Sequence, residues 1–514
     1  MFPILLALSR SLETITFTQK LNHFDVRDQA TFTQYAYLDK SYIKNGTYNS
    51  IILTLIDSEV LTPKNPFPQL AIEIANQTNS LLLALEIRYF DNSVIGNDTA
   101  GSTLYSLTIE QIHADIAQFL FAYEGNFNFL SSRILLVGTD FAASILSWFR
   151  YKYPQYSIGI WGSYAQTDTI LENTFIDQNI KARLTAISKH CYDLFQDMFD
   201  IMHSFVNTSQ ITNLIRLYEK FNFDVGTVGK DALYMWSYFF TMIDYFPGEK
   251  GEDNLKQVCE RINDYTLNDF DKTVEEFARI YKETAEKANV KISHLNPIYL
   301  LDISMSSSTR NSRLKQYLKC TQLGDFHVSN GFISPMINLD YYLYTCSDLF
   351  YIMSFRSIND TRKKYRNPYP GTVSIFTRNK GNIHHEVMPS ENVNNNVQVI
   401  ELPGIGRFFD INENSTKEYK EERENLRTTL IKWITNACAT NCDQGTCILE
   451  RCHCNNLYEG EFCHLNSYDQ SVVRNLSMYT TLAVTFVLVF FSSLGWYILL
   501  KVPIATYLTT GNYN

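Results

Sequence analysis

The sequence predicts an α/β fold, in which a mostly parallel β-sheet is interrupted by a large helical insertion. A small cysteine-rich module and one membrane-spanning helix are expected after it. Three observations support this prediction. Short apolar runs alternate with amphipathic stretches at both ends of the globular region, as in a parallel sheet. Long amphipathic stretches with few strand signals fill its middle, and dense cysteines precede an uncharged apolar segment near the C-terminus.

Six short apolar runs are predicted as buried strands: residues 51–56, 81–84, 134–137, 158–161, 373–376 and 397–402. Between the second and third runs, apolar residues recur with helical spacing over residues 109–123, which predicts a βαβ unit. Another helix is expected after Gly138 and ends before Pro154. A charged amphipathic helix over residues 416–435 closes the region.

The middle of the chain, from about residue 167 to 323, is predicted to be helical, with clear amphipathic stretches at 253–263 and 272–289. A sheet, a helical insertion and a return to the sheet fit an α/β-hydrolase with a large cap. We therefore expect the hydrolase core at residues 12–166 and 341–437, and a helical cap domain at 167–340.

Composition limits the functions open to the chain. Its 514 residues exceed what one hydrophobic core normally holds, so several domains are expected. The formal charge is −10 and there is no long basic run, which excludes nucleic acid as a partner because phosphate binding needs clustered Lys and Arg. No cofactor and no metal ion are expected.

Both ends of the chain carry membrane-targeting signals. Residues 1–11 resemble a short secretory signal peptide, although a buried N-terminal segment is the alternative. Residues 479–500 contain no charged side chain and as a helix would reach ~33 Å, enough to cross a bilayer core of ~30 Å. Trp496, Tyr497 and Lys501 lie at its inner end, where interfacial anchors are expected, and residues 501–514 are expected to form a short cytoplasmic tail. A buried core helix is the weaker alternative.

Six of the ten cysteines fall within residues 438–463. Their spacing, with Tyr458 and Gly460 in the last loop, resembles an epidermal-growth-factor-like module. Spacing alone leaves fifteen pairings open. The resemblance implies the following disulfides: Cys438–Cys447, Cys442–Cys452 and Cys454–Cys463. A zinc site using His453 or His464 is the alternative, which an oxidising compartment disfavours.

Seven Asn-x-Ser/Thr sequons are candidate glycosylation sites: Asn45, Asn76, Asn97, Asn207, Asn359, Asn414 and Asn475. Together with the cysteines they place the chain before residue 479 outside the cytoplasm. We expect a single-pass type I protein of the plasma membrane or an endolysosomal membrane. The remaining cysteines, whose pairing stays open, are expected to be disulfides or buried thiols rather than catalytic thiols: Cys191, Cys259, Cys320 and Cys346.

Several local strings resemble one family, the lysosomal Pro-X carboxypeptidase, dipeptidyl peptidase II and thymus-specific serine peptidase group of α/β-hydrolase exopeptidases. They are FTQKLNHF at residues 17–24, TFTQY at 31–35, ALEIRYF at 84–90, LTIEQIHAD at 107–115, WFRYKYP at 148–154 and YYLYTCSDLF at 341–350. Their order also matches, and the resemblance extends over about residues 14 to 437.

The resemblance implies where a catalytic site would lie and that its residues are replaced. A serine hydrolase needs a serine on a strand-to-helix turn, a histidine base and an orienting acid. Here the family's serine position holds Asp140, the acid position holds Asn382 and the histidine position holds Arg407. The glycine-rich loop that would help form an oxyanion hole has lost its glycines. The residues assigned to the oxyanion region are Ile56, Asp57, Ser58 and Phe141.

These replacements predict an inactive peptidase homologue that acts by binding a peptide or protein, and a homodimer is compatible with the sequence. Asp140 and Arg407 are expected to form an ion pair, which side-chain ends more than ~8 Å apart would contradict. The alternatives are an active prolyl-specific serine exopeptidase with a misaligned site and a purely adhesive ectodomain. Three weaker alternatives are Asp140 acting as a nucleophile, Ser163 as a displaced serine, and His384 or His385 as a base.

Overall fold

The structure, a computed structural model, divides the chain into two compact units, residues 1–436 and 437–514. It describes residues 12–124 except 49, 57 and 59, then 132–365, 374–389, 397–409 and 415–435 in the first unit. In the second unit it describes residues 445–448, 451–454, 458–459 and 465–466.

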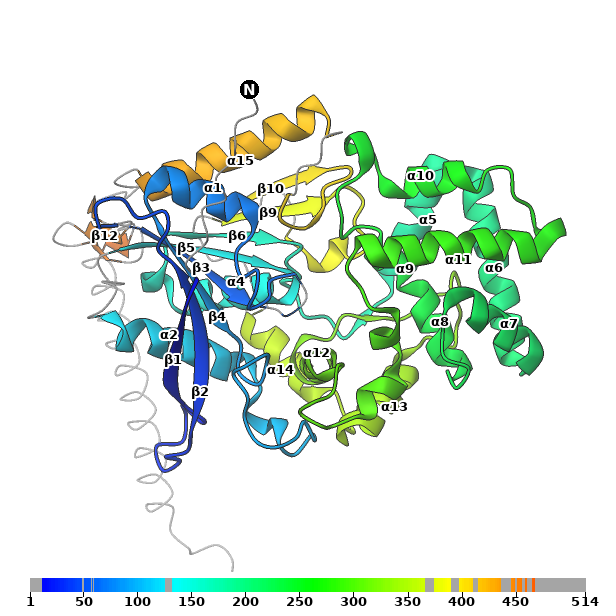
Figure 1. Ribbon diagram of the computed structural model, residues 1–514, viewed down its shortest axis with the longest axis horizontal. Helices are drawn as coiled ribbons and strands as arrows, with labels where there is room; N and C mark the ends of the chain where they lie inside the picture. The colour runs from blue at the N-terminus through cyan, green and yellow to red at the C-terminus, as the bar shows by residue number, and fades with distance from the viewer. Residues whose placement is uncertain are drawn as a thin grey trace, which may run out of the picture. The chain divides into compact units, whose positions relative to one another are not determined.

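An eight-stranded sheet forms the centre of the first unit (Figure 1). Its strands, in sheet order, are β1 (Leu12–Lys20), β2 (Thr31–Asp39), β4 (Leu81–Glu86), β3 (Ser50–Ile56), β5 (Arg133–Thr139), β6 (Gly159–Ser163), β9 (Ser374–Asn379) and β10 (Val397–Leu402). Strand β2 pairs antiparallel with both β1 and β4, and the other neighbours are parallel. This is the sheet of an α/β-hydrolase, and the six predicted strands all lie in it. The order also shows that β3 lies between β4 and β5, so the expected βαβ unit crosses over one strand.

Helices cover both faces of the sheet because the central strands are apolar on both sides. Alternate residues of β3, such as Ile51 and Leu53, pack into one core with α2 (Ile109–Ala122) and α4 (Asp140–Lys152). The intervening Ile52 packs into a second core with α1 (Gln69–Thr78) and α15 (Lys417–Thr435). This alternation follows from the period-two direction of strand side chains.

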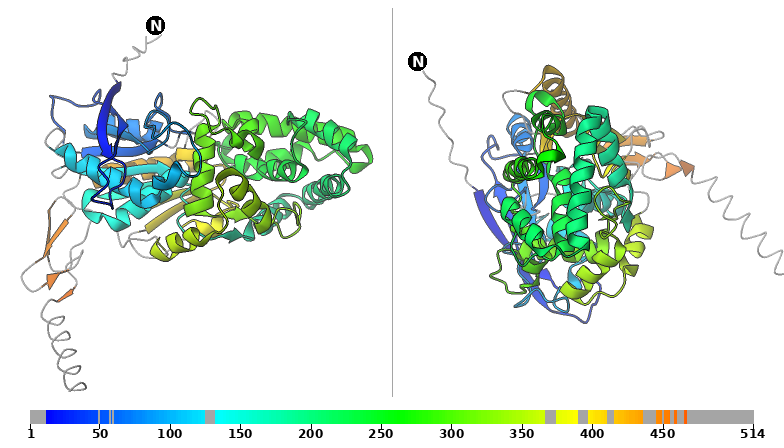
Figure 2. Two further views of the ribbon diagram at one scale, coloured as in Figure 1. Left: turned by 90° about the horizontal axis from the view of Figure 1, so that it is seen from below. Right: turned by 90° about the vertical axis from the view of Figure 1, so that its right-hand side faces the viewer.

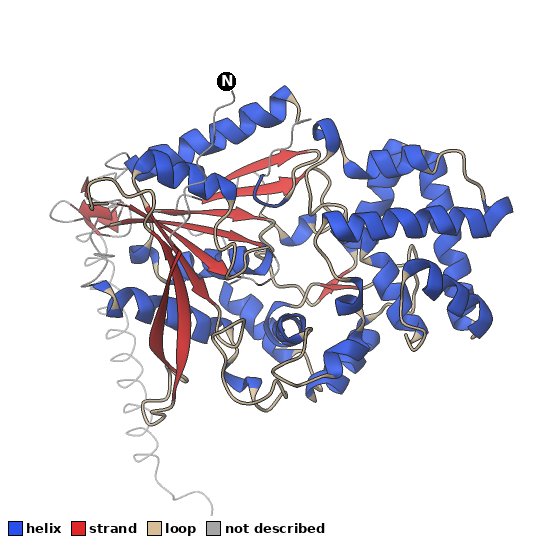
Figure 3. Ribbon diagram, viewed as in Figure 1, coloured by secondary structure: helices blue, strands red, loops and turns tan. Residues whose placement is uncertain are grey.

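A helical insertion lies beyond the carboxyl ends of the parallel strands (Figures 2 and 3). The arrowheads of these strands point toward the insertion. Its helices are α5 (Phe175–Ile187), α6 (Lys189–Asn207), α7 (Ile211–Phe221), α8 (Gly229–Ser237), α9 (Phe239–Met242), α10 (Asn254–Arg261), α11 (Phe270–Lys287), α12 (Arg310–Leu318), α13 (Leu339–Phe350) and α14 (Arg356–Tyr365). The predicted insertion ends at residue 340. The next strand of the large sheet begins at Ser374, after α13 and α14.

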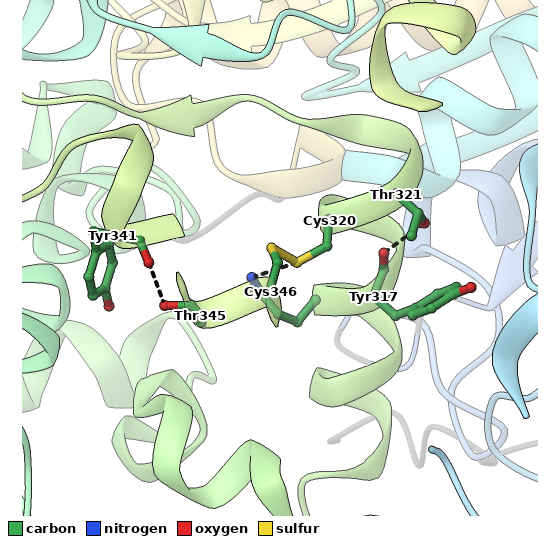
Figure 4. Close-up of a disulfide and its surroundings, with 7 residues drawn as sticks. Tyr317, Cys320, Thr321, Tyr341, Thr345 and Cys346 are labelled. Atoms are coloured by element: carbon green, nitrogen blue, oxygen red, sulfur yellow. Dashed lines mark hydrogen bonds between the residues drawn. A yellow bond between two sulfur atoms is a disulfide. The ribbon is translucent and has the colours of Figure 1, made fainter. Parts of the chain in front are cut away.

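Two disulfides join helices of the insertion. Cys191 of α6 is bonded to Cys259 of α10. Cys320, in a short π-helical segment that continues α12, is bonded to Cys346 of α13 (Figure 4). The four cysteines outside the C-terminal cluster are therefore all disulfide-bonded.

The second unit contains two short antiparallel pairs among its described residues. Strand β11 (Gly445–Ile448) pairs with β12 (Arg451–Cys454), and β13 (Tyr458–Glu459) pairs with β14 (Leu465–Asn466). Each of the three predicted disulfides includes a cysteine outside the described residues. The predicted signal segment 1–11, the span 479–500 and the tail 501–514 also lie outside the described residues. Within the part of the chain that is described, no helix has the length and apolarity to cross a membrane.

Candidate functional site

Asp140 occupies a sharp turn between strand β5 and helix α4. Its backbone has φ of +48°, a conformation that non-glycine residues rarely adopt. The turn is tight because β5 and α4 approach closely: a Cβ added to Gly138 would lie 2.9 Å from the Cα of Ala143. A strained strand-to-helix turn of this kind presents the nucleophile in α/β-hydrolases. Here it presents a carboxylate.

The predicted ion pair between Asp140 and Arg407 is confirmed. Nη2 of Arg407 lies 2.9 Å from Oδ2 of Asp140, and the Arg407 side chain is only 5% exposed. Arg407 begins a short 3₁₀ turn (Arg407–Phe409) after strand β10. Its guanidinium carbon lies 3.3 Å from the centre of the Tyr245 ring, a cation–π contact that further fixes the side chain.

Asn382, the third predicted position, has a local structural role. It is buried in the turn after β9, where its backbone N–H donates to the carbonyl of Asn379 at 3.0 Å. Its side-chain Oδ1 accepts from the backbone N–H of His384 at 2.8 Å. The structure thus brings Asp140 and Arg407 into contact, while the Asn382 side chain stabilises its own loop.

The loop after β3 does not present a free backbone donor at Ser58. The Ser58 N–H donates to the carbonyl of Leu61 at 2.9 Å, and its hydroxyl donates to Oδ2 of Asp91 at 2.5 Å. Ile56 is buried at the end of β3, and Asp57 lies outside the described residues. Phe141 follows Asp140 at the start of α4. An oxyanion hole needs N–H groups aimed at the developing charge, and the Ser58 N–H already has an acceptor.

Ser163, the alternative nucleophile, is fully buried at the end of β6. Its Oγ accepts from the backbone N–H of Phe408 at 3.2 Å, which ties β6 to the turn that holds Arg407. The adjacent Tyr164 hydroxyl contacts the carbonyls of Asp244 and Ile405. These contacts are structural.

His384, one of the two histidines considered as a base, is mostly buried and is paired with a carboxylate. Its side chain is 13% exposed, and Nδ1 lies 2.8 Å from Oδ2 of Asp325. Burial acts to raise the pKa of Asp325, but His384, Lys319 and Asn173 outweigh it, so that this pKa is lowered. His327 forms a similar pair, with Nε2 2.5 Å from Oδ1 of Asp177. The two pairs join residues 59 and 150 positions apart, so no local motif marks them.

A cavity of about 470 Å³ lies between the sheet and the insertion. Asp140, Arg407 and His384 line it from the sheet side, and Lys315, Lys319, Asp325, His327 and Tyr341 line it from the insertion. A site where the insertion meets the strand ends is where α/β sheets usually bind ligands. In the described part of the chain, no group of three or more His, Cys, Asp or Glu side chains could hold a metal ion.

Three comparisons relate the chain to known proteins. The family model described as serine carboxypeptidase S28 matches residues 19–385. The chain is 25% identical over 393 residues to the Caenorhabditis elegans protein named "Putative serine protease F56F10.1", covering 70% of this chain and 71% of that one. It is 21% identical over 343 residues to lysosomal Pro-X carboxypeptidase of Homo sapiens, covering 63% and 67%. Among solved structures, esterase E22 matches with a TM-score of 0.37 and 10% identity, over 82% of this chain and 100% of that chain.

Proposed function

Because the chain belongs to the serine carboxypeptidase S28 family, we propose that it is a catalytically inactive member that binds a peptide or protein in its cleft. The observation that carries this proposal is the Asp140–Arg407 ion pair at the strand-to-helix turn. A serine peptidase needs a hydroxyl there and an imidazole that can take its proton. Arginine stays protonated near neutral pH and cannot act as that base.

Asp140 is also a poor candidate for a nucleophile of another kind. The guanidinium at 2.9 Å neutralises its carboxylate, and this favours the ionic contact over attack on a substrate carbon. Such attack would also leave an ester that only an activated water could cleave. Asp140 and Arg407 therefore act as a structural ion pair at the cleft.

The alternative of an active exopeptidase cleaving next to proline needs another serine beside a histidine. Losing a triad serine or histidine in such an enzyme costs on the order of 10⁶ in turnover. Ser163 is buried and accepts from Phe408, which argues against it as that serine. The third candidate, a purely adhesive ectodomain with a filled cleft, is disfavoured by the cavity of about 470 Å³.

Activity-based labelling distinguishes the inactive peptide-binding protein from the active exopeptidase and from the adhesive ectodomain. The full-length chain in mild detergent is incubated with a fluorophosphonate probe and with Pro-containing peptides, beside active human lysosomal Pro-X carboxypeptidase as a positive control. We expect neither labelling nor hydrolysis, together with saturable peptide binding. A labelled serine would overturn the proposal, and loss of that label in Ser163→Ala would identify the residue.

We further propose that this unit lies outside the cytoplasm, held by a stalk that resembles an epidermal-growth-factor-like module and by the helix at 479–500. Five sequon asparagines are exposed in the described structure: Asn45, Asn76, Asn97, Asn207 and Asn359. Two disulfides in the insertion also fit an oxidising compartment. Glycosidase treatment should shift the mobility of the chain expressed in animal cells, and protease added to intact membranes should show which side it faces.

A further inference from the structure

The disulfide between Cys320 and Cys346 joins two segments that both line the cavity (Figure 4). Lys319 precedes Cys320 in the π-helical segment, and Thr345 precedes Cys346 in α13; both Lys319 and Thr345 line the cavity. The two cysteines are fully buried and are not among the described lining residues. The crosslink therefore holds the cavity wall from within the protein and does not itself face a ligand.

The loop that this disulfide closes supplies several residues of the wall. Cys320 and Cys346 are 26 residues apart in the chain. The described lining residues between them are Leu323, Gly324, Asp325, His327, Tyr341, Tyr342 and Thr345. Within the loop, the Tyr342 hydroxyl donates to the carbonyl of His327 at 2.9 Å, and the Tyr342 ring stacks on Phe326 with centroids 4.7 Å apart. The two lining segments of the loop are thus in direct contact with each other.

The π-helical segment (Lys319–Leu323) fixes where this loop leaves helix α12. The Gly324 N–H donates to the carbonyl of Lys319 at 3.0 Å, which is the five-residue hydrogen bond of a π-turn. Such turns are rare, and they are frequent at functional sites. Gly324 has φ of +67°, and a Cβ there would lie 2.4 Å from the carbonyl oxygen of Ile170, so a larger residue would clash. The disulfide therefore anchors an uncommon turn, which leads into strand β8 (Phe326–His327).

The other disulfide of the insertion has a different place. Cys191 and Cys259 join helices α6 and α10, and among the described residues neither helix contributes to the cavity wall. Both disulfides crosslink helices of the insertion, but only Cys320–Cys346 crosslinks segments that line the cavity. The Cys191–Cys259 disulfide is therefore a matched control within the same insertion.

We propose that the Cys320–Cys346 disulfide is a positioning element of the cleft, which holds segments 319–327 and 341–345 in the arrangement that binds a peptide. This inference rests on the proposed peptide-binding function and names a structural requirement of the same site. Without the crosslink the two segments would sample other arrangements, and only the fraction of molecules that keeps the present one would bind. The measured dissociation constant would rise by the reciprocal of that fraction.

The test compares Cys320→Ala with Cys346→Ala against the control Cys191→Ala with Cys259→Ala. Fluorescence anisotropy measures the binding of fluorescein-labelled Pro-containing hexapeptides to the full-length chain in mild detergent, at a temperature where each variant is folded. We expect removal of Cys320–Cys346 to weaken binding about tenfold, as for a competent fraction of about one tenth. Removal of Cys191–Cys259 should leave the affinity unchanged, although that disulfide closes the longer loop and its loss should cost more stability.

A second variant separates the crosslink from the packing of the cysteine side chains. Cys320→Val with Cys346→Ala restores buried volume without restoring the disulfide, so it should bind as weakly as the double alanine variant. Hydrogen–deuterium exchange provides a measurement on the wild type itself. Bound peptide should slow exchange in residues 319–327 and 339–350, and loss of the Cys320–Cys346 disulfide should speed it there.

The outcomes distinguish the two proposals. Wild-type affinity in either folded variant without Cys320–Cys346, an equal loss of affinity in the control, or no protection of residues 319–327 and 339–350 by bound peptide overturns the positioning role and leaves peptide binding standing. If no peptide binds the wild-type chain at any concentration tested, the proposed function fails and this inference fails with it.

Discussion

Asp140 holds a backbone conformation that costs free energy, and its contacts keep it there. Non-glycine residues at positive φ persist only where the surrounding structure enforces them. At this turn the close approach of α4 to β5 and the contact with Arg407 supply that enforcement. The strain that a hydrolase uses to present a nucleophile is thus combined here with a buried ion pair.

Replacing Asp140 with Asn tests the stabilising role of the pair. Asn tolerates positive φ, so the substitution removes the charge and leaves Arg407 buried without its counter-ion. We expect a loss of about 2 kcal/mol in the free energy of unfolding, below the full cost of breaking a buried pair because Asp140 is 22% exposed. Urea denaturation measures it.

The control is Asp25→Asn, which removes a surface pair with Arg27, a side chain that is 88% exposed. That variant should leave the unfolding midpoint essentially unchanged. Adding Arg407→Met to Asp140→Asn should recover part of the loss, because the buried guanidinium that the carboxylate neutralised is then gone as well. Full stability of the Asp140→Asn variant would contradict a structural role for the pair.

Asp231 is destabilising when ionised. Burial raises the pKa of Asp231 from 3.8 to about 6, with Asp348 adding to the effect and the hydrogen bond from Tyr341 opposing it. A raised pKa means that the contribution of Asp231 to stability is fully present below pH 3.8 and is lost as the pH rises through about 6. Asp231→Asn keeps an acceptor for Tyr341 and removes the charge.

We expect Asp231→Asn to stabilise the chain at pH 7.5 by about 2 kcal/mol, and to have little effect at pH 4. Melting temperatures of the variant and the wild type at the two pH values provide the measurement. An equal shift at both pH values would show that the effect does not come from ionisation.

At the scale of elements, helix α2 packs a neutral histidine against α4. His113 is fully buried, and its Nε2 lies 2.9 Å from the carbonyl of Ile145. Burial lowers the pKa of His113 to about 4, although the Ile145 carbonyl and Glu110 act to raise it. Between pH 6.5 and pH 4 the unfolded chain takes up a proton that the folded chain does not. Acidification through this range therefore reduces stability.

His113→Gln should remove this pH dependence, since a side-chain amide can still donate to the Ile145 carbonyl. Going from pH 7 to pH 5, the wild type should lose about 2 kcal/mol more stability than the variant. Denaturation curves at both pH values test this. The exposed His190→Gln should reproduce the wild-type profile, and parallel profiles for the wild type and His113→Gln would refute the account.

At the scale of the whole molecule, the first unit depends on contacts between the insertion and the sheet. Arg183 of α5 contacts Asp244 at 2.8 Å and also pairs with Asp253, all within the insertion. Asn379, at the end of β9, donates to Oδ1 of Asp244 at 2.8 Å. This network connects the insertion to the carboxyl end of β9.

Each of the two disulfides should add to the free energy of unfolding according to the length of the loop that it closes. Cys191 and Cys259 are 68 residues apart, and Cys320 and Cys346 are 26 apart. The loop-entropy relation predicts a loss of about 4 kcal/mol when the first pair is changed to Ala and slightly less for the second. Urea unfolding of each double variant provides the comparison. No loss in either variant would mean that these crosslinks barely restrict the unfolded chain.

Much of the fold could be predicted from the sequence because its signals are local. The apolar runs of β3, β4 and β5 and the helical periodicity of α2 appear within short windows, and each forms the expected element. The antiparallel strands β1 and β2 and helix α1 were not predicted. In the site, Asp140 and Arg407 were identified because the family resemblance aligns them with its serine and its histidine.

The rest of the site could not be predicted, because its partners are distant in the chain. His384 meets Asp325 through the packing of the insertion on the sheet, and no pattern around either residue indicates this. The acceptor of the Ser58 N–H is likewise decided by the shape of its loop.

By itself, the sequence determined the α/β class and the helical insertion, and it predicted Asp140 and Arg407 at the family's serine and histidine positions, since periodicity and motif are properties of neighbouring residues. Only the tertiary structure decided which charges neutralise one another and which face the cavity. The physical reason is that a charge acts over a few ångströms of space, whereas the chain brings such partners together from positions as far apart as 140 and 407.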